Sequence, residues 1–487
     1  MPKYTQVMPV VDCSDQEQLA SIMTKCGTVR ALTYNKLGSL QGWGQHWQKA
    51  DPIVRQVLPP NKLRLPSKLF EWSVSDCFKA IIAQQEAAKT FLIRKIYQHT
   101  SDDSTRKKLF HLLHSDPSAD NWLHRQFRKQ YQRGHTFLGN QVVYQSGGYK
   151  AKRLSRYRIK LEVQGLVRGK RISLIIKSNR LPVGQIRVLD KNGKLEVHTA
   201  FNREIPKTAQ PQKEMGMDKG YTEGFYLSDG RVVAPQLGEK LTQKTERIAQ
   251  VNKNRSRLAH HSLNHSHKQK RNKILRCNLG RKVQSRKFQR DQAEIKGMIR
   301  YGLRQVLTEP TIIYAEDLSS PIKSKKQAKR INRKLNQWMK GELQASLEEI
   351  GKLTGSTVKT VNAAYTSQVD YQTGTLLGCR VGNRFTRYTG EVLQSDYNAA
   401  LVILDRGTDE EIHRYMKYRE VRQVLLHRTV RYLHSIGYSV ESALKNGWLS
   451  TKFKSDALTV ESEYPPMGYR GRLSSTKGEA IQLELPL

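Results

Sequence analysis

Hydrophobic and polar positions divide the chain into two halves of different character. Residues 3–12 form a β-rich segment, and from Asp15 to about Arg133 apolar residues recur at three- and four-residue spacing, which predicts helices broken at prolines. Residues 152–205 then alternate basic and apolar positions, with Asn192–Gly193 as a hairpin turn. This alternation predicts an antiparallel, barrel-like sheet with a basic face. If the first strand joins that sheet, the helical block is an insertion.

The second half interleaves strands with helices, which indicates an α/β layer with a mixed sheet. Residues 215–235 predict strands separated by turns, one of them at Asp229–Gly230, and residues 237–305 are almost wholly helical. The remaining predicted elements are strands at 311–320 and 357–365 and helices at 327–355, 394–407 and 420–437, followed by a turn-rich tail from about Asp456.

The chain is strongly basic, because its 84 Lys and Arg exceed its 43 Asp and Glu by 41. Self-repulsion at such a charge destabilises a compact chain unless a polyanion neutralises it. Nucleic acid is therefore the first candidate partner, and an anionic membrane surface is the second. No apolar run reaches the ~20 residues that span a bilayer, and the N-terminus has no signal-peptide core. Five dispersed cysteines without a CxxC pair indicate reduced thiols, so we expect a soluble intracellular protein.

Three acids stand out, because each lies at the edge of an apolar element rather than in a polar surface run. Asp218 ends EMGM, Glu316 ends TIIYA, and Asp396 opens YNAALVIL. They are far apart in the sequence, so only a tertiary fold could bring them together. Each also has an ordinary explanation, respectively a turn residue, a strand-end residue and a helix N-terminal acid favoured by the macrodipole.

Phosphodiester hydrolysis gives a reason for three acids to meet. The reaction needs a nucleophilic water and a stabilised leaving oxygen on opposite sides of phosphorus, and two Mg²⁺ ions about 3.5–4 Å apart serve both needs. Mg²⁺ prefers oxygen ligands and keeps several waters, so a few carboxylates and a substrate phosphate suffice. We therefore expect Asp218, Glu316 and Asp396 to be catalytic residues that bind Mg²⁺ and repel one another without it.

The segments GMDKG, IIYAEDLSS and LQSDYNAALVIL resemble the three split RuvC motifs of TnpB proteins and of compact type V CRISPR effectors. The metal-binding acids of that family match Asp218, Glu316 and Asp396 one for one. Residues 30–40 and 361–368 are also similar to family segments. The specific motifs lie within about residues 212–405, and the N-terminal half agrees in layout more than in sequence.

The resemblance implies a multidomain α/β and α+β fold. In it, a RuvC-like RNase H domain follows a wedge β-barrel into which a helical recognition lobe is inserted. The implied boundaries are 1–14 and 134–210 for the wedge, 15–133 for the recognition lobe, 211–365 for the nuclease with a basic helical insertion, 366–392 for a degenerate zinc-ribbon-like nucleic-acid-binding loop, 393–407 for the third RuvC motif, and 408–487 for a C-terminal helical extension and tail.

The same resemblance implies an RNA-guided, Mg²⁺-dependent DNA endonuclease. It would pair a guide RNA with double-stranded target DNA beside a short flanking motif and cut both strands at one RuvC site. The protein would be a monomer within a ribonucleoprotein, in the prokaryotic cytosol near the nucleoid, with no membrane partner. The family often carries two CxxC pairs after TSQ, whereas residues 366–392 hold Cys379 alone, so we expect no zinc. Two alternatives stay open: an RNA-guided DNA-binding repressor that does not cut, and a guide-independent transposase.

An RNA-guided enzyme needs a basic channel that follows the shape and backbone of the heteroduplex. Basic stretches occur at 147–160, 253–290 and 323–334, and the first mixes Tyr with Arg and Lys, which suits phosphate contact and base stacking. A solvated basic face is the simpler explanation for each stretch. The predicted nucleic-acid-binding residues are Arg30, Tyr34, Asn35, Lys150, Lys152, Arg153, Arg156, Arg158, Arg255, Arg257, Lys270, Arg271, Arg276, Arg281, Lys282, Lys325, Lys326, Arg330, Gln368, Arg380 and Arg384.

Overall fold

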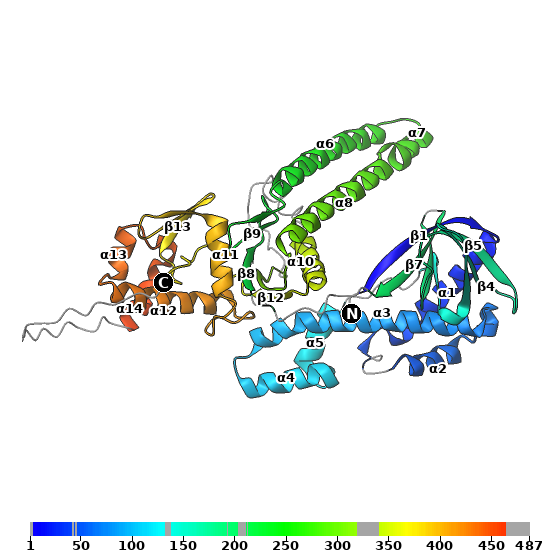
Figure 1. The fold of residues 1–487 in the computed structure, drawn as a ribbon, viewed down its shortest axis with the longest axis horizontal. Helices are drawn as coiled ribbons and strands as arrows, with labels where there is room; N and C mark the ends of the chain where they lie inside the picture. The colour runs from blue at the N-terminus through cyan, green and yellow to red at the C-terminus, as the bar shows by residue number, and fades with distance from the viewer. Residues whose placement is uncertain are drawn as a thin grey trace, which may run out of the picture. The chain divides into compact units, whose positions relative to one another are not determined.

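The computed structural model describes residues 3–463 apart from 41–42, 44–45, 132–137, 192, 203–210, 212 and 319–339. Its elements, shown in Figure 1, belong to two compact units. The first unit contains residues 1–209 and 352–355, and the second contains residues 210–351 and 356–487. None of the described helices is both long enough and apolar enough to cross a membrane.

The first unit is built on a seven-stranded antiparallel sheet with the strand order β2-β6-β7-β1-β5-β4-β3. Strand β1 (Lys3–Cys13) lies between β7 (Lys194–Asn202) and β5 (Arg171–Lys177), although the helical block separates it from both in the sequence. The other strands are β2 (Gln141–Tyr144), β3 (Tyr149–Ser155), β4 (Arg158–Gln164) and β6 (Ile186–Lys191). Strands β4 and β5 bury every second residue, which is the period that the basic and apolar alternation predicted.

Five helices follow β1 before the sheet resumes at β2. They are α1 (Gln16–Leu37), α2 (Trp47–Val57), α3 (Ser67–His99), α4 (Asp103–Ser115) and α5 (Asn121–Gln130). The N-caps of α1, α4 and α5 are aspartates whose side chains accept a backbone N–H three residues on, so a local sequence signal starts each helix. Helices α1, α2 and α3 share one hydrophobic core with the sheet, and the end of α3 forms a second, smaller core with α4 and α5.

The second unit contains a five-stranded mixed sheet with the order β10-β9-β8-β11-β12. Strands β8 (Lys213–Asp218), β11 (Thr311–Glu316) and β12 (Thr357–Val361) are parallel, whereas β9 (Phe225–Leu227) and β10 (Val232–Val233) are antiparallel. Helix α11 (Ser395–Asp405) packs against β8, and α10 (Lys340–Thr354) connects to β12. The mixed α/β class predicted from the sequence is therefore observed.

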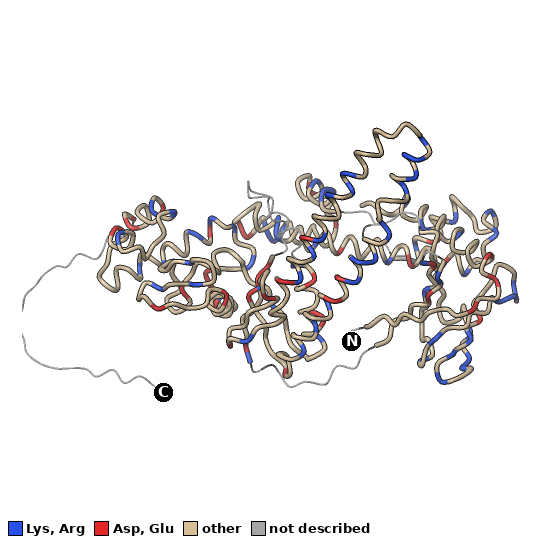
Figure 2. The backbone as a smooth tube through the Cα atoms, turned by 90° about the horizontal axis from the view of Figure 1, so that it is seen from above, with Lys and Arg blue, Asp and Glu red and all other residues tan. Residues whose placement is uncertain are grey.

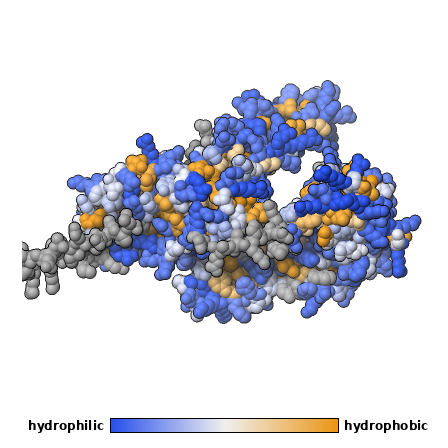
Figure 3. All heavy atoms as spheres, viewed as in Figure 1, coloured by the Kyte–Doolittle hydropathy of each residue, from blue (hydrophilic) through white to orange (hydrophobic). Residues whose placement is uncertain are grey.

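A long helical hairpin separates β10 from β11 in the sequence. It consists of α6 (Leu237–Leu263), α7 (Lys268–Lys273), a π-helical turn (Ile274–Asn278) and α8 (Arg281–Val306), and α7 lies at the tip in Figure 1. Ion pairs join α6 to α8, among them Lys240 to Glu294 at 2.6 Å. Figure 2 marks the Lys and Arg residues in blue, and hydrophilic residues dominate the surface of the hairpin in Figure 3. The almost wholly helical prediction for 237–305 is confirmed.

The C-terminal part of the second unit combines a small sheet with helices. The elements are β13 (Gly378–Val381), β14 (Arg384–Arg387), β15 (Val392–Gln394), α12 (Tyr418–Ser435), α13 (Val440–Lys445) and α14 (Lys454–Glu463). These helices share one core with the segment before β13, and the backbone N–H of Gly378, the first residue of β13, donates to the carbonyl of Trp448 at 2.8 Å. The predicted start of the tail at about Asp456 is wrong, because residues 456–463 belong to α14, where Ala457 and Val460 are buried, and residues 464–487 lie outside the described residues.

Candidate active site

Two of the three predicted acids end adjacent parallel strands. The register pairs Met217 of β8 with Ala315 of β11, so the next residues, Asp218 and Glu316, are neighbours at the same edge of the sheet. Both side chains are buried, since the two residues are 9% and 7% exposed. The carboxyl edge of parallel strands is where α/β sheets commonly bind ligands.

The third acid, Asp396, is placed by the contact between a helix and a glycine. A Cβ added to Gly216 would lie 2.1 Å from the carbonyl oxygen of Ala400, so only glycine allows α11 to lie directly on β8. Asp396 lies in the first turn of α11, whose N-cap residue Gln394 accepts the backbone N–H of Tyr397 at 2.6 Å. The glycine of the GMD segment therefore brings the start of α11 toward the end of β8.

The acids interact electrostatically. Burial raises the pKa of Asp218 well above its usual value, and the negative charges of Glu316 and Asp396 raise this pKa further. Burial also raises the pKa of Glu316, against the opposing effect of a hydrogen bond from the hydroxyl of Thr366. The charges of Glu316 and Asp396 therefore both act on Asp218, so the three predicted residues lie within electrostatic range of one another.

Two cations lie against this group. The Lys219 ammonium donates to the carbonyl oxygen of Glu316 at 2.5 Å and to the side chain of Gln344 at 2.6 Å. Burial lowers the pKa of Lys219 to about 8, although neighbouring carboxylates raise it in part. The Arg380 guanidinium, from β13, donates to the Asp396 carboxylate at 2.9 Å.

Sequence reasoning found Arg380 only as a nucleic-acid contact, and it did not find Lys219 or Thr366. Lys219 could have been noticed because it directly follows Asp218, and Thr366 because it lies in the TSQ segment. No sequence signal predicted the pairing of Arg380 with Asp396, because the pairing depends on how the β13–β14 hairpin is folded.

A cavity of about 560 Å³ adjoins Glu316. It lies beside the carboxyl end of β11, the strand β12 and helix α10, and its charged lining residues are Lys219, Lys340, Arg414, Glu316, Asp317 and Glu348. Arg414 is ion-paired with Asp317 at 2.7 Å. A volume of this size suits a small-molecule ligand, and the equal numbers of acids and cations in the lining select neither an anion nor a cation.

The chemistry of the acids fits Mg²⁺. All three side chains offer hard oxygen donors. The pKa of Asp218 is raised first by burial and then by the charges of Glu316 and Asp396, and a divalent cation would offset both effects. Among the described residues, no three His, Cys, Asp or Glu side chains are arranged around a single ion position, and Arg380 bonds Asp396 instead.

The predicted nucleic-acid contacts fall into three groups. Most are surface residues, including all five on the β3–β4 hairpin, and their role stays a prediction. Arg30 and Tyr34 require a correction, because both are buried and Arg30 forms an ion pair with Asp76 at 2.5 Å, so they stabilise the first unit from inside. Lys325, Lys326 and Arg330 lie outside the described residues.

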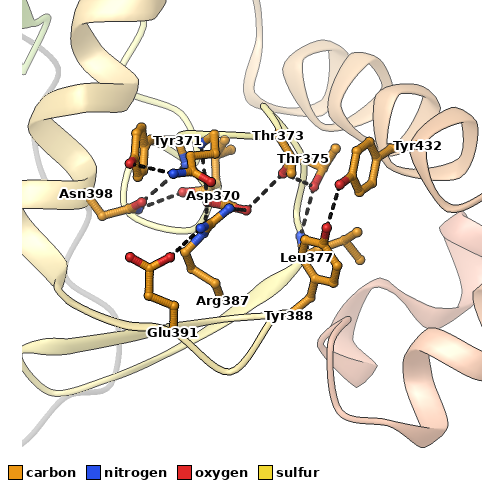
Figure 4. Close-up of polar contacts among 12 residues, drawn as sticks. Asp370, Tyr371, Thr373, Thr375, Leu377, Arg387, Tyr388, Glu391, Asn398 and Tyr432 are labelled. Carbon is orange, nitrogen blue, oxygen red and sulfur yellow. Dashed lines mark hydrogen bonds and ion pairs between the residues drawn. The ribbon is translucent and has the colours of Figure 1, made fainter. Parts of the chain in front are cut away.

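The segment at 366–392 is fastened by a buried ion pair, shown in Figure 4. Arg387 of β14 donates to both oxygens of Asp370, at 2.9 and 3.3 Å, and to Glu391 at 2.5 Å. The Arg387 and Asp370 side chains are 5% and 0% exposed. Cys379 is exposed on β13. Packing and this ion pair therefore order the segment that the sequence linked to a zinc ribbon.

Neither a protein-family model nor a curated protein sequence matches the chain. Similar solved structures include a Cas12f1–sgRNA–target DNA complex, with 13% identity over 84% of this chain and 99% of that one and a TM-score of 0.40. The mini-RNA-guided endonuclease CRISPR-Cas_phi3 has 11% identity over 83% and 92% of the two chains and a TM-score of 0.42. C2c1 of Alicyclobacillus acidoterrestris with single-guide RNA has 11% identity over 82% and 67% and a TM-score of 0.33.

All three neighbours are CRISPR effectors, the class to which the sequence motifs pointed. Such low identities and TM-scores carry no argument about activity.

Proposed function

We propose that the chain is an RNA-guided, Mg²⁺-dependent DNA endonuclease with a single RuvC-like site in its second unit. The observation that carries this proposal is the convergence of Asp218 and Glu316 on adjacent strand ends with Asp396 at the start of α11, marked by the raised pKa of Asp218. The β8–β11–β12 order with two antiparallel strands at one side supports an RNase H-like fold. The basic excess and the exposed β3–β4 hairpin support a nucleic-acid partner.

In this proposal, Asp218, Glu316 and Asp396 hold the divalent ions. When bound, Mg²⁺ would supply an activated water and stabilise the leaving oxygen. Lys219 fixes the end of β11 through the Glu316 carbonyl and limits the negative charge around the acids. Arg380 neutralises Asp396 in the free chain, and its partly exposed guanidinium can turn to a substrate phosphate when nucleic acid enters.

The test uses full-length protein expressed in its host context, with sequencing of any co-purified RNA. A plasmid complementary to that RNA, with varied flanking sequence, is then incubated with Mg²⁺ and either wild-type protein or Asp218→Asn. We expect wild type to linearise the plasmid and the variant to retain RNA without cutting. Bound RNA with an intact plasmid would favour a repressor, and cutting without any RNA would favour a transposase. Undiminished cutting by Asp218→Asn would contradict the site.

A further inference from the structure

The first unit contains a second cavity, remote in sequence from the acids. It has a volume of about 460 Å³ and lies between the C-terminal end of α1 and one face of α5. Gly38, Ser39 and Leu40 form one wall, and His124, Phe127, Arg128 and Tyr131 form the other. The α5 residues recur at three- and four-residue spacing, so a single helical face presents them.

Aromatic rings dominate this wall. The rings of Phe127 and Tyr131 are nearly parallel, with an interplanar angle of 11° and centroids 5.7 Å apart. Trp43 meets Phe127 edge to face at 4.9 Å, and its indole N–H donates to the carbonyl of Ser115 at 3.1 Å. The Lys89 ammonium lies 4.6 Å from the Trp43 ring centroid. The rings are thus held in fixed positions before any ligand arrives.

The polar residues in the lining include one cation, Arg128, and the imidazole of His124, which can donate a hydrogen bond. None of the described residues that line the cavity is an acid. Arg128 is exposed, so its guanidinium can contact a charged group at the cavity mouth. Aromatic planes select a flat ring, and cationic donors select an anion beside it. A purely apolar ligand would gain nothing from the Arg128 guanidinium, whereas a nucleotide uses both the aromatic ring and the cation.

We propose that this cavity binds one unpaired nucleotide of a nucleic-acid strand. The base would contact the partly exposed Tyr131 ring, which packs on the buried Phe127 ring, and the adjacent phosphate would contact Arg128 and His124. The cavity holds a volume typical of ligand sites, which is enough for one nucleotide but not for a duplex. This site would hold a single base that has left its stack, on the helical part of the first unit. The proposal rests on the proposed function in one respect, because that function names the guide or the target as the source of the strand.

Photocrosslinking of the full-length protein tests this proposal. The probes are single-stranded RNA containing iodouridine and single-stranded DNA containing iododeoxyuridine, followed by mass spectrometry of the crosslinked peptides. We expect a crosslink in the α5 peptide that contains Phe127 and Tyr131. A crosslink to the RNA probe identifies a guide as the source, and a crosslink to the DNA probe identifies a target strand.

Matched variants complete the test. Tyr131→Leu should weaken binding of the single-stranded probe about tenfold, because base stacking is lost. Arg128→Gln should reduce the slope of log K for RNA binding against log salt concentration by about 0.7. Arg125→Gln is the control, because Arg125 lies on the same helix outside the cavity lining. If crosslinks form only elsewhere and Arg128→Gln behaves like Arg125→Gln, the cavity proposal is overturned while the proposed function stands. If no probe binds anywhere, both fall.

Discussion

Replacing Arg387 with methionine should release the segment at 366–392 from the second unit. The substitution keeps much of the side-chain volume but leaves the Asp370 carboxylate, which is 0% exposed, without the guanidinium that now contacts both of its oxygens. Removing one partner of a buried ion pair typically costs about 3–5 kcal/mol. Asp370 keeps weaker donors, the hydroxyl of Thr373 at 3.1 Å and the backbone N–H of Gln372 at 3.3 Å, so we expect the lower half of that range.

Hydrogen exchange read by mass spectrometry measures this cost locally, through the opening free energy of the amides in β13 and β14. Arg384→Met is the control, because Arg384 is exposed on the same strand and should change protection by less than about 0.5 kcal/mol. Adding Asp370→Asn to Arg387→Met should recover about 1–2 kcal/mol by removing the buried charge. Equal protection in the Arg387 and Arg384 variants would refute the role of the ion pair.

Three further predictions concern the acids, the helix contact and the basic hairpin. The raised pKa of Asp218 lets the folded state bind more protons than the unfolded state. In the presence of a chelator, the free energy of unfolding should therefore fall as pH rises above the ordinary aspartate range. Thermal melts should show a smaller fall for Asp218→Asn. In the same melts, Mg²⁺ at ten times its Kd should stabilise wild type by about 1.4 kcal/mol and the variant much less. Gly216→Ala should force α11 away from β8, which costs about 1–3 kcal/mol in urea unfolding and reduces cleavage. Replacing Lys150, Lys152 and Arg153 by Gln should lower the salt slope of RNA binding by about 2. Lys107→Gln with Lys108→Gln is the control and should leave the slope unchanged, because both lysines are exposed on α4 and belong to none of the predicted contacts.

The elements that carry the acids could be predicted because their signals are local. An apolar run bounded by an acid marks β8 and β11, and an apolar helical repeat marks α11. The hairpin turn at Asp229–Gly230 also follows from its residue types, and Gly230 has the positive φ of 83° that such turns require.

The errors arose where partners distant in the sequence decide the environment. Arg30 looked like a surface cation. Its guanidinium instead donates a hydrogen bond inside the first unit to the carboxylate of Asp76, which lies 46 residues away in the sequence. The sequence of α14 is mostly polar and resembled the start of a tail. Only two of its residues are buried, and α14 is stabilised by their packing against the neighbouring helices. The contact between Arg380 and Asp396 depends on the position of β13 relative to α11, which no local pattern encodes.

Iron-directed cleavage of the protein backbone tests most directly whether the three acids share a metal site. Fe²⁺ replaces Mg²⁺, and ascorbate with peroxide generates hydroxyl radicals that cut the chain next to the bound ion. If Asp218, Glu316 and Asp396 bind one metal centre, we expect fragments ending near all three residues, suppressed by excess Mg²⁺ and by Asp218→Asn. Cuts at only one of these three places, or a cutting pattern that Asp218→Asn leaves unchanged, would contradict a shared metal site.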